Sequence, residues 1–278
     1  MNSIWHEERI SHEDGTLAAF SAGPPDAPPV VLVHGLGHWT QAAWNGLAQR
    51  LAPRRRIVAF DLPGFGASDK PDAPYALATF RAALARVVAH FELERFSLVG
   101  HSFGGLVAAD YAAYASPHVG MLALLDPAGF LRTPSLALRI FASRPAERAL
   151  ARLRPSRRFI DRTLRMAVYD PASWPPEVAR QAYELSADPA LVRAFARVYA
   201  GALREFLQLD ALHARLRAWQ GPTLLVWGRH DRYVPVRALV RAREVYPQAT
   251  ALVLERCGHC PAVEWPDRIA RALFDTGA

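Results

Sequence analysis

The 278-residue sequence predicts an α/β fold, a mostly parallel sheet covered by helices and interrupted by an all-helical insertion. Two observations predict it. Short apolar or β-branched runs alternate with longer stretches of helical periodicity, and this alternation stops after Asp126 and resumes at Pro222. With 51% hydrophobic and 21% charged residues, the composition is that of a globular protein and excludes disordered, collagen-like and coiled-coil classes.

The expected elements follow the chain in order. An N-terminal hairpin is expected around residues 4–10 and 16–22, because Asp14-Gly15 between them favours a tight turn. Apolar runs predict strands at residues 29–34, 56–61, 95–100, 119–126, 222–228 and 250–255. Amphipathic periodicity predicts helices at residues 41–51, 79–91, 104–115, 236–245 and 266–274.

Residues 130–220 contain helical stretches punctuated by prolines and no strand signal. Such an insertion is interpreted as a cap over the carboxyl edge of the sheet, where open α/β sheets place their sites. We therefore expect a core of residues 1–129 and 221–278, with a helical cap of residues 130–220.

The net charge of +7 is concentrated in the predicted cap. Residues 130–220 hold sixteen arginines against eight acidic residues, so the rest of the chain sums to −1. Arginine-rich composition alone is one explanation, and attraction of an acidic substrate or an acidic carrier protein is another. Nucleic-acid binding is not expected, because no recognition motif accompanies the charge.

Nothing in the sequence predicts a membrane span or an export signal. No apolar run approaches the ~20 residues that a membrane helix needs. The first residues carry Trp5, His6, Glu7 and Glu8 where a signal peptide needs an apolar stretch. We expect a cytoplasmic protein.

Ser102 is the candidate nucleophile. It lies in Gly100-His101-Ser102-Phe103-Gly104, directly after one predicted strand and before a predicted helix. At such a turn a serine is held on a strained elbow that the flanking glycines permit, and its hydroxyl projects into the cleft.

A serine hydroxyl needs a base, and the base needs a carboxylate that fixes its tautomer. His259 is the candidate base, because Gly258 allows a tight turn just beyond the last predicted strand. Asp231, in the loop after the preceding strand, is the leading carboxylate, and Asp126 at the end of residues 119–126 is its competitor. His101 is expected to point away from the cleft. Five other histidines are expected at the surface: His6, His12, His90, His118 and His213.

Attack on a carbonyl creates an oxyanion that needs preorganised N–H donors. The glycines of His34-Gly35-Leu36-Gly37 free the backbone of Leu36 to supply one donor, and Phe103 after the nucleophile supplies the second. His34 is expected to be a structural hydrogen-bonding residue.

These motifs together resemble the α/β-hydrolase superfamily over residues 20–278. Residues 61–68, Asp-Leu-Pro-Gly-Phe-Gly-Ala-Ser, are similar to the turn usual there in the family. The resemblance implies an eight-stranded sheet with a cap after the sixth strand and a triad in the order Ser, Asp, His. Ser102 stands where epoxide hydrolases and haloalkane dehalogenases of the family have an aspartate, and His101 where the carbon-carbon hydrolases typically have asparagine.

By elimination we expect hydrolysis of a small-molecule carboxylic ester, with no metal or organic cofactor. The candidate substrate-binding residues are aromatic: Trp39, Phe130, Trp174 and Tyr233. Alternatives are a thioesterase or an esterase on an acidic carrier-linked substrate, a carbon-carbon hydrolase, and a non-catalytic receptor. Cys257 and Cys260 spell a thiol-redox motif, but they lie late in the chain, after the last strand, which argues against a thiol oxidoreductase.

Overall fold

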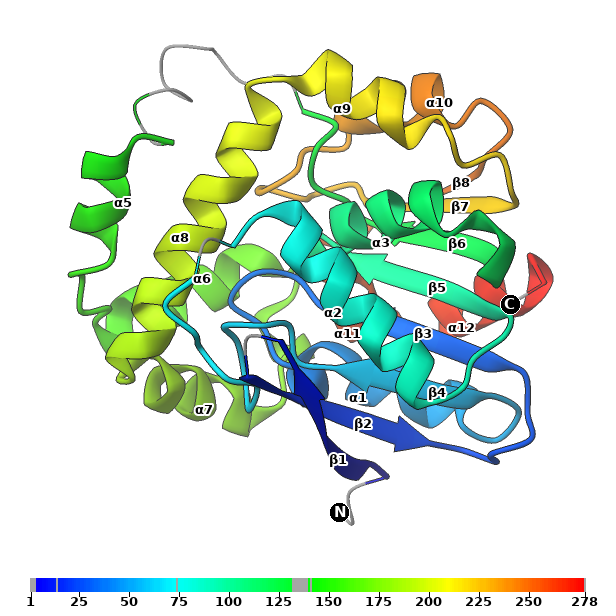
Figure 1. Ribbon diagram of the computed structural model, residues 1–278, viewed down its shortest axis with the longest axis horizontal. Coiled ribbons are helices and arrows are strands. Elements are labelled where there is room, and N and C mark those ends of the chain that lie inside the picture. Colours follow the sequence, from blue (N-terminus) through cyan, green and yellow to red (C-terminus); the bar gives the residue numbers. More distant parts are fainter. Residues whose placement is uncertain (1–3, 14, 74, 132–139, 141, 278) are drawn as a thin grey trace.

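The computed structural model describes residues 4–13, 15–73, 75–131, 140 and 142–277. Eight strands form one sheet in the order β1-β2-β4-β3-β5-β6-β7-β8 (Figure 1). β1 and β2 pair antiparallel, and β2 joins β4 antiparallel, whereas every other pair of neighbours is parallel. The predicted fold class and hairpin are confirmed.

The strands begin and end within about one residue of the positions that the apolar runs predict in the parallel part of the sheet. They are β1 (His6–His12), β2 (Gly15–Ala22), β3 (Pro29–Val33), β4 (Arg56–Phe60), β5 (Phe96–His101), β6 (Val119–Leu125), β7 (Thr223–Gly228) and β8 (Thr250–Leu254).

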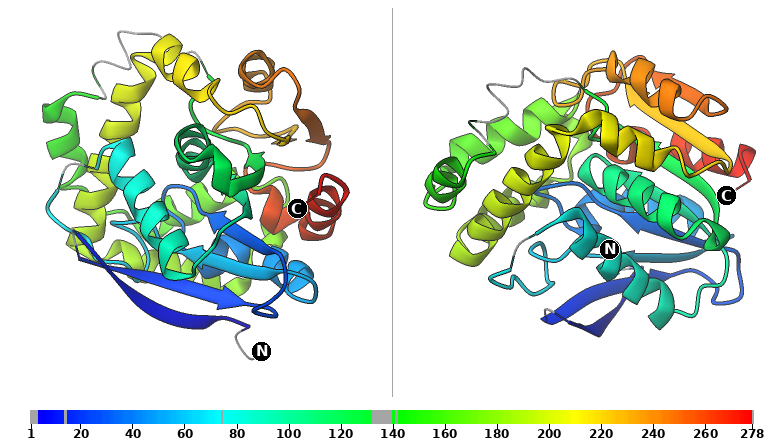
Figure 2. Two further views of the ribbon diagram at one scale, coloured as in Figure 1. Left: turned by 45° about the vertical axis from the view of Figure 1, so that its right-hand side comes forward. Right: turned by 45° about the horizontal axis from the view of Figure 1, so that its top comes forward.

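Helices cover both faces of the sheet (Figures 1 and 2). On one face α2 (Leu77–His90), α3 (Phe103–Tyr114), α9 (Leu209–Leu216) and α10 (Ala238–Val245) pack over Val31 and Val33. On the other, α1 (Thr40–Leu51), α11 (Pro261–Glu264) and α12 (Pro266–Asp275) pack over Val30 and Leu32. This alternation of successive residues explains why the β3 run is apolar throughout.

Between β6 and β7 the described residues form helices and no strand. These are α5 (Arg144–Leu150), α6 (Arg157–Ala167), the 3₁₀ turn η2 (Pro171–Ser173), α7 (Pro176–Ser186), α8 (Pro189–Phe206) and α9. Prolines stand in the first turn of α5, η2, α7 and α8, where their missing N–H costs nothing. Four of the prolines in this segment, Pro145, Pro171, Pro176 and Pro189, therefore lie where helices begin.

The sheet reverses its winding direction at β3. The chain passes from β3 to β4 on one side and returns with β5 on the other side of β3, so the loops after β3 and β5 diverge from one point. Figure 1 shows β5 pointing toward α6 and α8 of the insertion. None of the helices within the described ranges is long and apolar enough to cross a membrane.

Candidate active site

Ser102 occupies a strained turn between β5 and α3. Its backbone angles are φ 54° and ψ −119°, in the left-handed half of the Ramachandran plot that a residue with a side chain rarely adopts. Gly104 makes the turn possible, because a Cβ there would lie 2.3 Å from the carbonyl oxygens of Val33 and His34. The glycine pattern therefore reflects close packing of α3 on the end of β3.

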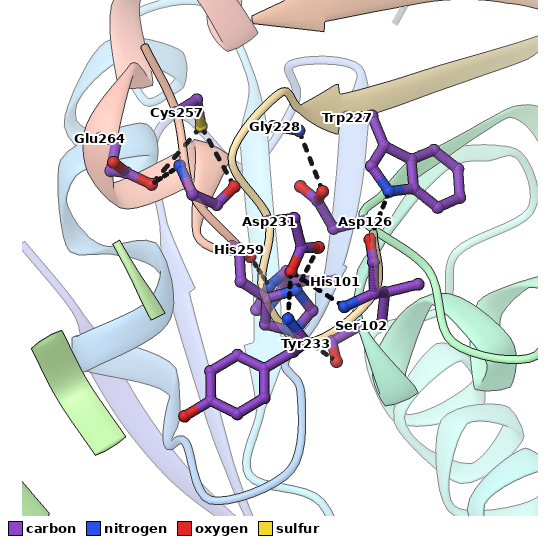
Figure 3. Close-up of polar contacts among 12 residues, drawn as sticks. His101, Ser102, Asp126, Trp227, Gly228, Asp231, Tyr233, Cys257, His259 and Glu264 are labelled. Carbon is purple, nitrogen blue, oxygen red and sulfur yellow. Dashed lines mark hydrogen bonds and ion pairs between the residues drawn. The ribbon is translucent and has the colours of Figure 1, made fainter. Parts of the chain in front are cut away.

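A continuous chain of hydrogen bonds joins Ser102, His259 and Asp231 (Figure 3). The Ser102 hydroxyl lies 2.9 Å from Nε2 of His259, and Nδ1 of His259 lies 2.7 Å from Oδ2 of Asp231. Because the carboxylate only accepts, Nδ1 carries the proton and Nε2 is left to accept from the hydroxyl. Both His259 and Asp231 are buried.

The second oxygen of Asp231 is fixed by the backbone. Its Oδ1 accepts hydrogen bonds from the amides of Tyr233, at 2.7 Å, and Val234, at 2.9 Å. These bonds orient the carboxylate, so that Oδ2 faces the imidazole.

Asp126 lies beside this pair and has different partners. It follows β6 with φ 44°, is fully buried, and its Oδ1 accepts from the amide of Gly228 at 3.0 Å. Burial raises the pKa of Asp126 well above its usual range, and the charge of Asp231 raises it further. Both effects favour the protonated form of Asp126, and the carboxylate that accepts the hydrogen bond from His259 is that of Asp231.

Asp126, Asp231 and His259 also form a group of possible metal ligands, with one ligand atom of each within 4.8 Å of the others. Nδ1 of His259 carries the proton that it donates to Oδ2 of Asp231, so it has no lone pair for a metal, and two amides donate to the other carboxylate oxygen. These ligand atoms of Asp231 and His259 are therefore already engaged in hydrogen bonds within the protein. The arrangement fits a proton relay better than a cation site.

The loop after β3 closes on the serine. A Cβ on Gly35 would lie 2.9 Å from Cβ of Ser102, so only glycine allows the backbone of this loop to come so near. The amides of Leu36 and Phe103 donate to no acceptor among the described residues. They are therefore available to an external oxygen.

Several neutral histidines surround the triad. Burial lowers the pKa of His38 to about 3 and that of His101 well below its usual range, and nearby imidazoles add to both shifts. His34 accepts from the amide of Leu62 at 3.0 Å and donates to the Gly35 carbonyl at 2.8 Å, which confirms its structural role. The site is polar but carries no fixed positive charge on these rings.

Glu264 of α11, which the sequence motifs did not single out, supports the loop of His259. It accepts from the amides of Gly258, at 2.7 Å, and Tyr169, at 2.6 Å. The amide of His259 in turn donates to the carbonyl of Ala167 in α6, at 2.7 Å. Contacts with the insertion therefore hold the histidine loop on two sides.

A strained serine after β5, a histidine after β8 and a carboxylate after β7 are features shared with one large family. A family model described as alpha/beta hydrolase fold matches residues 28–266. The chain belongs to this family.

Relatives of this alpha/beta hydrolase differ in the reactions they are named for. A 2-hydroxy-6-oxo-2,4-heptadienoate hydrolase of Pseudomonas putida is 29% identical over 255 residues, which cover 89% of this chain and 88% of the relative. The solved structure of a 2-hydroxy-6-oxo-6-phenylhexa-2,4-dienoate hydrolase from Rhodococcus is 28% identical, with a TM-score of 0.80 and coverage of 98% of both chains. A bacterial membrane phospholipase A is also 28% identical, with a TM-score of 0.79, covering 99% of this chain and 86% of that one.

The four aromatic candidates for substrate binding lie in different surroundings in the hydrolase. The Tyr233 ring lies 5.3 Å from that of His259, and its hydroxyl donates to the Thr163 carbonyl of α6. The Trp174 ring lies 5.8 Å from that of His38 and its indole N–H donates to the Leu164 carbonyl. Trp39 is 8% exposed at the start of α1, and among the described residues no hydrogen bond or ring contact joins it to Ser102, His259 or Asp231.

Two expectations are wrong. Phe130 is fully buried, with its ring 5.3 Å from that of His213 and 6.2 Å from that of Tyr246, so it packs as a core residue and not as a lining of the site. His213 is correspondingly buried, not at the surface, and donates to the Gly129 carbonyl at 2.8 Å. Its stacking on Phe130 could not be predicted from a helical pattern that treats histidine as polar.

Cys257 and Cys260 are free thiols in the hydrolase. They are 0% and 2% exposed, and burial, with acidic neighbours, raises the pKa of both thiols. A redox cysteine needs a lowered pKa and access to solvent. The environment of these thiols is the opposite.

Proposed function

We propose that the protein is a serine hydrolase that cleaves carboxylic esters through an acyl-enzyme intermediate. Ser102 Oγ attacks the ester carbonyl carbon while Nε2 of His259 takes the hydroxyl proton, and the amides of Leu36 and Phe103 stabilise the oxyanion. The intermediate collapses as His259 returns the proton to the departing alcohol. Water, deprotonated by His259, then attacks the acyl carbon and releases the acid and the serine.

The hydrogen-bond chain from Ser102 through His259 to Asp231 carries this proposal. It combines a base within reach of the nucleophile, a carboxylate that fixes the tautomer of the base, and two unoccupied amides beside the same serine. Asp231 stabilises the imidazolium that forms when the proton moves.

The charges around the site support a neutral substrate. The groups that shift the pKa values of His38, His101 and Asp126 are histidines and acids, with no arginine or lysine among them. An ester needs no counter-ion, whereas the dienoates in the names of two relatives carry a carboxylate that a cation would have to pair. One compared structure is named a phospholipase, and phospholipases A cleave carboxylic esters.

Carbon-carbon bond hydrolysis is the second candidate, because relatives at 28–29% identity bear that kind of name over nearly the whole chain. The same serine, base and amides would serve it. What differs is the group that binds the substrate carboxylate, and burial lowers the pKa values of His34, His38 and His101, which disfavours a positive charge on these three rings.

We further propose that residues 130–220 form the cap that selects the substrate, with Tyr233 and Trp174 against the ester and Trp39 behind them. The contacts of α6 with Tyr233 and His259, and of the Trp174 ring with that of His38, support this assignment. An acidic or carrier-linked substrate and a cytoplasmic location stay predictions.

The test is hydrolysis of p-nitrophenyl esters of increasing acyl length by wild type and Ser102→Ala. We expect turnover beyond one equivalent, and a loss of about 10³-fold or more in kcat in the variant. A ring-cleavage dienoate assayed in parallel decides the second candidate. A higher kcat/KM on the dienoate than on every ester would assign the carbon-carbon reaction, and activity that survives Ser102→Ala would contradict both.

A further inference from the structure

The outer side of α6 and the loop before it carry a concentration of unpaired positive charge. Residues 152–165 include one acid, Asp161, and six exposed arginines: Arg152, Arg154, Arg157, Arg158, Arg162 and Arg165. None of the six forms an ion pair with any residue that the structure describes. Arginines elsewhere, such as Arg50, Arg180 and Arg229, hold carboxylate partners.

Two large apolar side chains project among these arginines. Phe159 is 60% exposed in the first turn of α6, and Leu153 is 55% exposed in the preceding loop. The opposite side of the helix, with Ile160 and Leu164, is half-buried against the protein. α6 therefore has an inner apolar face and an outer face where aromatic and cationic side chains mix.

From this juxtaposition we infer that the outer face of α6 docks on the surface of an anionic lipid bilayer. Guanidinium groups at the headgroups and a Phe or Leu side chain at the acyl boundary are the two contributions that bind a helix in the plane of a membrane. The exposed apolar groups distinguish this surface from one that only attracts charge.

Because α6 contacts the loops that hold Tyr233 and His259, docking of this helix would bring the candidate active site near the membrane. Its carboxyl half supplies the carbonyls of Thr163 and Ala167 that accept from the Tyr233 hydroxyl and the His259 amide. From Arg157 to Ala167 the helix rises about 15 Å. Docking through its amino half would hold the serine within reach of a lipid surface.

Binding is measured by co-sedimentation with vesicles of phosphatidylcholine alone and of phosphatidylcholine mixed equally with phosphatidylglycerol. Wild type is expected to partition at least about 100-fold more strongly onto the mixed vesicles, less so as salt is added. Each arginine near the surface contributes about fivefold, so Arg157→Gln/Arg158→Gln/Arg162→Gln should weaken partition on the order of 100-fold. Phe159→Ser should weaken it about tenfold and leave a salt-sensitive remainder.

The matched control changes three exposed arginines outside the insertion, Arg237→Gln/Arg243→Gln/Arg271→Gln, and is expected to stay within about twofold of wild type. Ser102→Ala should bind as wild type does, because the docking does not rest on the proposed catalysis. Equal binding to both vesicles, or equal loss in the control, would overturn the inference. So would arginine-dependent binding to a purified acidic acyl carrier protein without binding to vesicles, which would assign the face to a protein partner.

Discussion

The ring of His101 donates from Nε2 to the backbone carbonyl of His259 over 2.6 Å. The residue before the candidate nucleophile therefore holds the loop of the candidate base, and the two rings lie 4.9 Å apart (Figure 3). The His101 side chain is buried in this structural contact. The elbow and the base are thus connected twice, once through Ser102 and once through its neighbour.

Replacing His101 by Phe removes this donor and keeps a ring of similar size. We expect a fall of about tenfold in kcat on the best ester and a loss of about 1–3 kcal/mol in the free energy of unfolding, because the buried carbonyl loses its partner. Ester kinetics and urea denaturation measure the two effects. His101→Gln, whose amide can donate from a similar position, should recover most of both, and full activity of His101→Phe would contradict the role.

Replacing Asp231 or Asp126 by asparagine distinguishes the roles of these two acids near His259. Asp231→Asn should lower kcat by about 10³–10⁴-fold, because the amide favours the wrong tautomer of the base. Asp126→Asn should change kcat by less than about tenfold, since it leaves the bond between Asp231 and His259 in place. Steady-state kinetics on one ester decides, and the reverse order of effects would assign the role to Asp126.

The raised pKa of Asp126 makes stability depend on pH with a definite sign. The folded state binds a proton that the unfolded carboxyl, with a pKa of about 3.9, releases, so wild-type stability falls as pH rises above that value. Asp126→Asn keeps the oxygen that accepts from Gly228 and has no such proton. As pH rises from about 4 to about 8, the free energy of unfolding of the variant should therefore increase relative to that of wild type. Parallel curves from urea denaturation would show that Asp126 is charged in the fold.

Two helical glycines should respond in opposite directions to alanine. At Gly104 the new Cβ would meet backbone oxygens at 2.3 Å, and we expect a loss of about 1–3 kcal/mol or more. At Gly46 in α1 the nearest atom would lie at 3.6 Å, and the better helix propensity should add about 0.5–1 kcal/mol. Thermal denaturation of both variants provides the comparison, and equal effects would mean that α3 is not packed this closely.

The two thiols should resist labelling in the native protein. Because both are buried with raised pKa values, a thiol reagent should react with neither until a denaturant is added, and then with both. Ester hydrolysis should proceed equally with and without reductant. Rapid native labelling, or a rate that depends on reductant, would restore a redox role for Cys257 and Cys260.

Much of the framework could be predicted from the sequence because its signals are local. β3 and β5 are apolar on both faces and end beside glycine, so their bounds follow from the printed residues. The positions of Ser102, Asp231 and His259 follow as well, since each lies in a loop where a strand ends. The spacing of glycines around Ser102 predicts that two backbone segments lie close together, and in the structure Gly104 packs against the carbonyls at the end of β3.

What could not be predicted depends on tertiary contacts. Asp126 and Asp231 both follow strands, and only the orientation of the side chains puts one against His259 and the other against Gly228. From the sequence, Phe130 is an aromatic residue expected beside the edge of the sheet. Its burial under His213 depends on where α9 lies. Glu264 carries no motif, because its partners are backbone amides contributed by distant loops.

The amide of His259, held by the carbonyl of Ala167, limits how freely the parts of this protein could be exchanged. A chimera that received a foreign segment between β6 and β7 would lose the acceptor for this amide, although every residue of the triad would still be present. Such a transplant has to bring a replacement carbonyl to the same place before it can alter selectivity. In this chain, the segment between β6 and β7 and the loop that carries His259 share a backbone hydrogen bond and are not separately interchangeable.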